Sequence, residues 1–119
     1  MSVTQIAIGR LLRDADALCH RRNMNTAVEL GKCDFEPIDH GVEFYKAHYL
    51  LDSQHSEYSE SVARVIYHPS DHLWWLYIPG KVATGSDEPM WYAYPYLPNS
   101  AELSCLLEEI ERDPRAYFW

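Results

Sequence analysis

Cysteine is scarce in this chain, with three residues in 119, at positions 19, 33 and 105. They are odd in number and far apart, and no C-x-x-C pair occurs, which excludes a disulfide framework and a zinc ribbon. Cys19 and Cys105 fall on the apolar faces of two predicted helices. We therefore expect reduced thiols, with these two buried as small hydrophobic side chains.

Long apolar runs and positive charge are also lacking. The longest unbroken apolar run, "LWWLYI" at 73–78, is far shorter than the ~20 residues of a membrane helix. The first residues, "MSVTQIAIGRLLRD", reach charged side chains too soon for a secretory signal peptide. Ten Lys and Arg against eighteen Asp and Glu give a formal net charge of −8, which repels phosphate backbones and anionic lipid surfaces. We expect a cytoplasmic protein with no nucleic-acid partner and no membrane contact.

Two segments show the apolar spacing of an amphipathic helix. In the first, from Thr4 to about Arg22, apolar residues recur at three- and four-residue intervals, and Ser2 opens a capping box. The second follows Asn99, a predicted N-cap, and should end at the Asp-Pro pair at 113–114. Its apolar face is traced by Leu103, Leu106, Leu107 and Ile110. The three aromatic residues at 117–119 are expected to dock against the domain or a neighbour.

Between the helices the apolar period changes to two, interrupted by Gly, Pro, Asp and Ser, as in antiparallel strands joined by turns. We expect strands near 41–51, 61–68, 73–78 and 90–94, and a weaker one at 27–35. The segment "PGKVATGSDEP" at 79–89 should be a longer exposed loop. This order predicts one α+β domain over residues 1–119, in which an antiparallel meander of four to five strands carries both helices on one face.

The stretch "HLWWLYIPG" at 72–80 places two adjacent tryptophans in one strand. Strand side chains alternate between faces, so Trp74 shares a face with Leu76 and Ile78, and Trp75 shares the other with Tyr77. Because the hydroxyl of Tyr77 favours a polar rim, we predict that Trp74 lies in the helix-covered core and Trp75 at an interface.

The carboxyl half contains four motifs in order: "WWLY" at 74–77, "WYAYPYLP" at 91–98, "LLEEIERDP" at 106–114 and "YFW" at 117–119. With these motifs it resembles a bacterial domain family of unknown function, the one numbered 3024, over about half of the chain. Such families often include products of mobile gene cassettes. The resemblance implies a compact bacterial cytoplasmic protein and brings no catalytic residues.

The residues in "HPSDH" are the most metal-like cluster, because His68, Asp71 and His72 flank a tight turn and could converge with His40 or His48. Zinc requires three or four ligands with fixed support, and the same residue types are common in exposed turns, so we predict no metal and no other cofactor. Neither a G-x-S-x-G motif nor a cysteine beside a base is present, and the carboxylates at 108–111 fall mainly on a solvated helix face. The sequence does not favour an enzyme.

Aromatic residues are concentrated between positions 67 and 96, on strands that carry apolar side chains on both faces. Two helices can cover one face of such a sheet, and Tyr and Trp are favoured at interface centres, so we expect a homodimer formed through the second face. An alternative is an apolar small molecule bound between these strands and the loop at 79–89, by a binder or a cryptic enzyme. Another is an acidic, immunity-type inhibitor of a basic partner, suggested by the net charge alone. The candidate interface or ligand-binding residues are Trp75, Tyr77, Trp91, Tyr92, Tyr94, Arg64 and His72.

Overall fold

The computed structural model describes residues 3–25, 31–49, 56–82 and 89–119. A long helix, α1 (Val3–Asn25), begins the described chain, and the predicted capping box at Ser2 lies outside the described residues. Its buried stripe follows the predicted helical spacing: Leu11, Ala15, Leu18 and Cys19. No helix within these ranges combines the length and the apolar character needed to cross a lipid bilayer.

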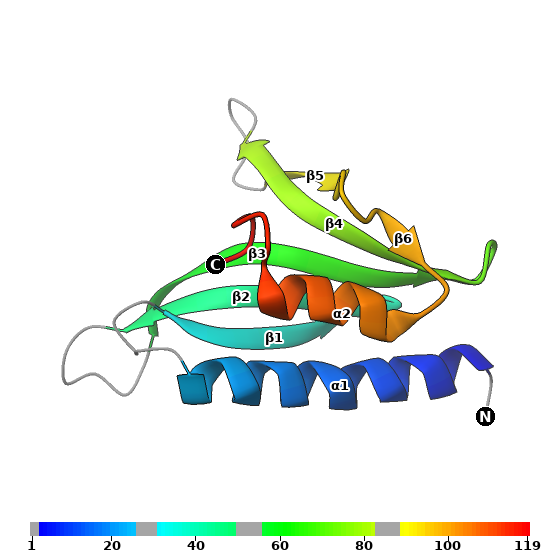
Figure 1. Ribbon diagram of the computed structural model, residues 1–119, viewed down its shortest axis with the longest axis horizontal. Helices are drawn as coiled ribbons and strands as arrows, with labels where there is room; N and C mark the ends of the chain where they lie inside the picture. Colours follow the sequence, from blue (N-terminus) through cyan, green and yellow to red (C-terminus); the bar gives the residue numbers. More distant parts are fainter. Residues whose placement is uncertain (1–2, 26–30, 50–55, 83–88) are drawn as a thin grey trace.

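The strands form an antiparallel meander in which each strand lies beside the next along the chain (Figure 1). A last two-residue strand, β6, pairs with β4 rather than extending the series. The strands are β1 (Lys32–Ile38), β2 (Gly41–Tyr49), β3 (Ser56–His68), β4 (Leu73–Val82), β5 (Pro89–Ala93) and β6 (Asn99–Ser100). The expected loop at 79–89 is therefore partly strand, since β4 continues to Val82, and residues 83–88 lie outside the described part.

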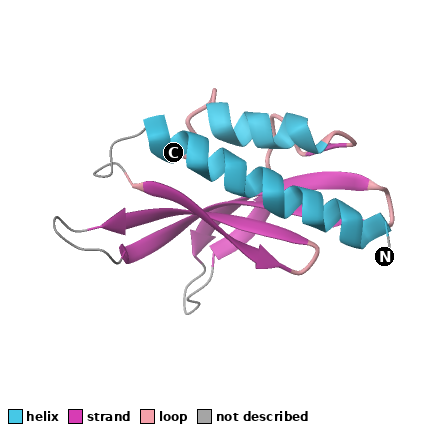
Figure 2. Ribbon diagram, turned by 90° about the horizontal axis from the view of Figure 1, so that it is seen from below, coloured by secondary structure: helices cyan, strands magenta, loops and turns pink. Residues whose placement is uncertain are grey.

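The second helix, α2 (Leu103–Arg112), lies beside α1, and both helices cover the same face of the sheet (Figure 2). The predicted α+β arrangement is confirmed. The predicted cap is wrong, because Asn99 belongs to β6 and pairs with Trp75. Glu102 occupies the N-cap position without a side-chain cap bond, and its backbone N–H instead donates to Ser100 Oγ at 3.0 Å.

The core lies between the helices and the sheet. Trp74, 6% exposed, packs its ring 4.9 Å from that of Tyr67, which confirms its predicted place in the core. Tyr94 is fully buried among the rings of the carboxyl-terminal segment. Cys19 and Cys33 are buried, but Cys105 is exposed, which corrects the expectation that it packs inside. The apolar stripe of α2 is narrow enough to leave position 105 on its solvent side.

The carboxylate of Asp113 anchors the backbone of the segment after α2. Asp113 adopts a left-handed conformation with φ 47° and ends the helix as predicted. Its carboxylate oxygens accept backbone N–H bonds from Tyr117, Phe118 and Trp119 at 2.7 to 3.2 Å. Phe118 is buried, as the docking prediction requires, whereas Tyr117 remains 47% exposed. This carboxylate folds the tail, residues 114–119, back onto the domain.

Gly41 stands where β3 comes too close to β2 for any side chain, because a Cβ there would lie 2.0 Å from the carbonyl oxygen of Val65. We expect Gly41→Ala to force the two strands apart and lower the free energy of unfolding by about 1–3 kcal/mol or more. Gly9→Ala is the matched control, since nothing lies within 4 Å of its added methyl and alanine favours the helix by about 1 kcal/mol. Urea denaturation of both variants measures the difference, and equal stabilities would contradict the close approach.

Candidate functional site

The sheet face opposite the helices carries the candidate site. Strand pairing defines it, because directly paired residues share a face: Trp75 pairs with Ile66, Tyr77 with Arg64, and Glu43 with Arg64. Neither helix covers this side (Figure 2). We call it the open face; its main members are Glu36, Glu43, Tyr45, Arg64, Ile66, His68, Leu73, Trp75, Tyr77, Pro79 and Trp91.

Three rings with nearly parallel planes form a cluster on the open face, next to the β3–β4 turn. The ring centroid of Trp75 lies 5.2 Å from that of His68 and 6.3 Å from that of Tyr77, with interplanar angles of 20° in both pairs. Tyr77 Oη and His68 Nε2 are hydrogen-bonded at 3.2 Å, and Trp75 Nε1 donates to Asp71 Oδ2 at 2.9 Å. All three rings are half-buried, so they are fixed in position before any partner arrives.

Arg64 joins the aromatic and acidic parts of this face. Its Nε donates to Glu43 Oε1 at 2.5 Å, and its guanidinium lies 4.1 Å from the ring centroid of Trp91. Glu43 is only 5% exposed, and its other oxygen accepts a bond from Ser61 Oγ at 3.3 Å. The buried carboxylate is therefore paired with a cation and hydrogen-bonded, as a buried charge requires.

The hydroxyl groups on this face remain protonated at neutral pH. Burial, and then the negative charge of Asp71, raise the pKa of Tyr77 above its usual value. Burial, and then a hydrogen bond with Glu43, raise the pKa of Tyr45, whose hydroxyl also donates to Glu36 Oε2 at 3.2 Å. For Asp71 itself, desolvation raises the pKa, but the bonds from Trp75 and the Leu73 backbone outweigh it and leave the pKa lowered.

The open face brings together four of the seven residues that the sequence singled out: Arg64, Trp75, Tyr77 and Trp91. The other three lie elsewhere. Tyr94 is in the core, and Tyr92 pairs with Ile78 on the helix-bearing side, where it is 51% exposed. His72 lies in the β3–β4 turn with φ 58°, and its Nδ1 contacts Tyr67 Oη at 3.3 Å. Alternation along β5 puts Tyr92 on the side opposite Trp91, and Tyr94 follows on that same side, so these tyrosines cannot share the open face with Trp91.

Sequence reasoning did not assign His68 and Glu43 to this site. The sequence marks His68 only as a possible metal ligand, although its pairing with Leu73 in the hairpin puts it on the same face as Trp75. Glu43 in the apolar context "GVEFY" was a usable signal, since a buried carboxylate needs a cationic partner. Within the described ranges, no three His, Cys, Asp or Glu side chains are grouped so as to hold a metal ion.

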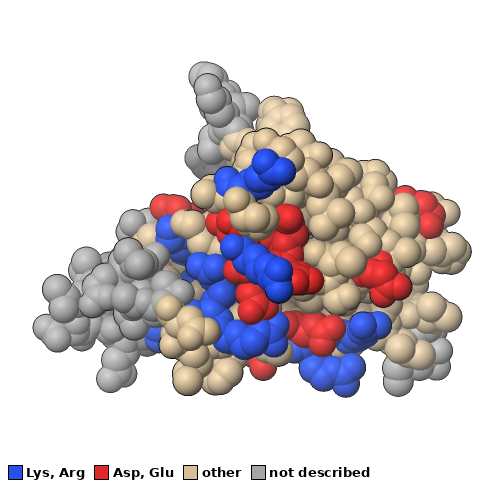
Figure 3. All heavy atoms as spheres, viewed as in Figure 1, with Lys and Arg blue, Asp and Glu red and all other residues tan. Residues whose placement is uncertain are grey.

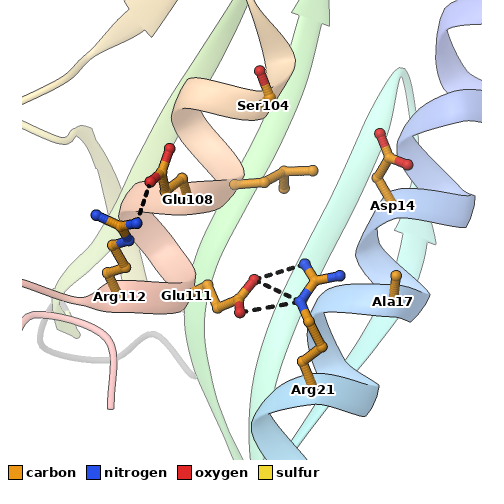
Figure 4. A pocket seen from close by; sticks show the side chains of 8 residues that line it. Asp14, Ala17, Arg21, Ser104, Glu108, Glu111 and Arg112 are labelled. Carbon is orange, nitrogen blue, oxygen red and sulfur yellow. Dashed lines mark hydrogen bonds and ion pairs between the residues drawn. The ribbon is translucent and has the colours of Figure 1, made fainter.

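A hollow of about 370 Å³ lies between α1 and α2 (Figure 4). Arg21 bridges it, with Nε and Nη2 donating to the carboxylate of Glu111 at 2.7 to 3.1 Å, and this hydrogen bonding lowers the pKa of Glu111. Arg112 pairs with Glu108 at 2.9 Å along α2. Acidic and basic side chains are intermixed on this side of the molecule (Figure 3). One of these ion pairs links the two helices and the other lies within α2, so the basic side chains that line the hollow are already paired with carboxylates.

A family model described as "Domain of unknown function (DUF3024)" matches residues 3–119. The chain belongs to this family. The match covers essentially the whole chain and corrects the expectation that the likeness is limited to the carboxyl half. No curated protein and no solved structure matches the chain. Because DUF3024 carries no assigned activity, the function of this member has to be argued from its open face.

Proposed function

We propose that this domain is an interaction module that forms a homodimer by packing the open faces of two copies together. The adjoining rings of His68, Trp75 and Tyr77, on a face that neither α1 nor α2 covers, carry this proposal. Fixed aromatic rings are the side chains that interface centres favour, because they bury a large area and lose little conformational freedom. No catalytic role is part of this proposal.

The size and the charge of the open face suit a second copy. The two longer dimensions of the molecule are 45 and 36 Å, which accommodates the ~800 Å² per partner of a standard interface. Arg64 and Glu43 are already paired with each other, so packing over them does not leave either charge alone. Asp34 and Glu36 lie on the edge strand β1, where they would form a polar rim.

The edges of the sheet are less suitable for association than its face. Edge strand β1 contains Pro37, which has no backbone N–H to donate, and it also carries two acidic residues. Edge strand β5 begins at Pro89 and has only five residues. Proline, charge and shortness are features that prevent edge-to-edge pairing of sheets. Face-to-face packing, with sheets about 10 Å apart, is therefore the favoured mode.

The test compares two single variants by light scattering coupled to size exclusion. The wild-type protein is expected at twice the chain mass of 13.9 kDa. Trp75→Ala should raise the dissociation constant of the dimer by about 30-fold or more, as loss of an interface anchor does. Tyr92→Ala removes an exposed aromatic ring from the other side of the sheet and should leave the mass unchanged. Circular dichroism checks that both variants keep their fold.

The alternatives give different results in the same experiment. A wild-type mass near 13.9 kDa at tens of micromolar would contradict the homodimer. A monomer stabilised by one class of apolar compound would instead support a small-molecule site walled by Tyr77 and Trp91, with Arg64 as polar handle. A monomer that captures a basic protein only at low salt would support the acidic-inhibitor alternative.

A further inference from the structure

Two buried thiols from different elements meet where α1 packs on β1. Cys19 lies on the buried face of α1 and is 6% exposed, and Cys33 lies near the start of β1 and is 5% exposed. Cys33 pairs with Lys46 and alternates with Asp34 of the open face, so its side chain points toward the helix layer. Both belong to the same apolar core.

Asn23 fixes the backbone of Cys33 against the last turns of α1. Its Nδ2 donates to the Cys33 carbonyl oxygen at 2.9 Å, and the Cys33 N–H donates to Asn23 Oδ1 at 2.8 Å. Asn23 follows Cys19 by four residues, so the two side chains lie on the same side of the helix, one turn apart. The clamp therefore holds Cys33 against α1 within about one helical turn of Cys19.

The two thiols also interact with each other. A hydrogen bond with the Cys19 thiol, followed by burial, raises the pKa of Cys33. Arg22, the neighbouring residue on α1, acts in the opposite direction as a nearby positive charge. The guanidinium is held by the Glu111 carbonyl oxygen at 3.0 Å and by the ring of Trp119, 4.4 Å from its centroid. A cation is thus fixed beside the pair by α2 and the tail.

We propose that Cys19 and Cys33 are a modification site at which an oxidant of the peroxide class forms a reversible disulfide between α1 and β1. The first thiol loses its proton and its thiolate attacks hydrogen peroxide, so that an S–O bond forms, the O–O bond breaks, and the leaving hydroxide takes up that proton to give a sulfenic acid and water. The second thiol attacks that sulfur, forming the S–S bond and releasing a second water. Two thiols are oxidised and one peroxide is reduced to two waters, which balances the reaction.

Burial makes this dithiol slow to react while the domain is closed, because the thiolate is the reactive form. Reaction therefore requires a local fluctuation that admits the oxidant while Cys19 and Cys33 stay together, and the nearby Arg22 then favours the thiolate. The resulting bond closes a loop of about 15 residues, which should raise the thermal midpoint by about 10 °C.

The experiment uses the full chain with Cys105→Ala, which removes the exposed thiol. After hydrogen peroxide, denaturation and alkylation, we expect an intact mass lower by two hydrogen atoms, no alkylated cysteine, and a linked peptide containing Cys19 and Cys33. Dithiothreitol should restore both thiols, and the oxidised form should melt higher. The matched control Cys33→Ala in the same background should show none of these changes.

Alkylation of both cysteines after peroxide would overturn the assignment. So would a mass gain of oxygen atoms without a linked peptide, because it would mean that the thiols oxidise separately. A linked protein that melts below the reduced form would show that the bond does not fit the native fold.

Discussion

Trp74→Ala should lower the free energy of unfolding by about 3–5 kcal/mol, a large share of the 5–15 kcal/mol typical of a domain. The ring is 6% exposed and packs on Tyr67, and its strand pairs with β3 on one side and β6 on the other. Truncation leaves a cavity in the middle of the core that the paired strands cannot collapse to fill. Urea denaturation followed by circular dichroism measures the loss.

Trp75→Ala is the control, since it removes the same side chain from the adjacent position on the other face. The comparison is made at a concentration where the protein is monomeric. There, Trp75→Ala should lower the free energy of unfolding by about 2 kcal/mol less than Trp74→Ala, or by a still smaller amount, because the ring of Trp75 is only half-buried. Equal denaturation midpoints for the two variants would contradict the two-faced account of this strand.

Asp113→Ala is expected to lower the free energy of unfolding by about 3 kcal/mol and to release the tail from the domain. The substitution removes an ionised acceptor from three backbone N–H groups and leaves alanine at φ 47°, a left-handed conformation that it adopts poorly. Trp119 would lose its place beside Arg22, so its fluorescence should shift to longer wavelength. Denaturation curves and emission spectra measure the two effects.

Asp113→Asn separates the two causes, because asparagine tolerates the left-handed region and keeps one acceptor oxygen. Asp113→Asn should lower the free energy of unfolding by about half as much as Asp113→Ala. Asp16→Ala on the exposed side of α1 removes the same charge elsewhere and should change stability by less than about 0.5 kcal/mol. A stable Asp113→Ala variant with unchanged emission would show that the tail docks without the carboxylate.

The elements and faces of this fold could be predicted because they follow repeating patterns. Alternation alone separates Trp74 from Trp75, and a 3.6-residue period places Leu11 and Leu18 in the core. The exceptions depend on single tertiary contacts. Asn99 has the chemistry of a cap but is used as a strand residue, because its backbone pairs with Trp75.

The candidate site was less accessible to sequence reasoning. Trp75 and Tyr77 could be assigned to one face by counting along one strand, whereas the contact between Arg64 and Trp91 joins two strands that are not adjacent in the sheet. Such a pair depends on strand register and on the reach of a long side chain. The secondary-structure propensities of single residues carry no information about register or about reach.

The docked tail has a consequence for the order of folding. Strands β1 to β5 each pair with the next strand along the chain, so their contacts can form early and at little cost in loop closure. The carboxyl-terminal contacts close much larger loops, since Arg22 reaches the carbonyl of Glu111 and Lys46 reaches that of Trp119. The sheet can therefore form before the tail docks, and the burial of Tyr94 under Tyr117 and Phe118 is expected to be a late step of folding.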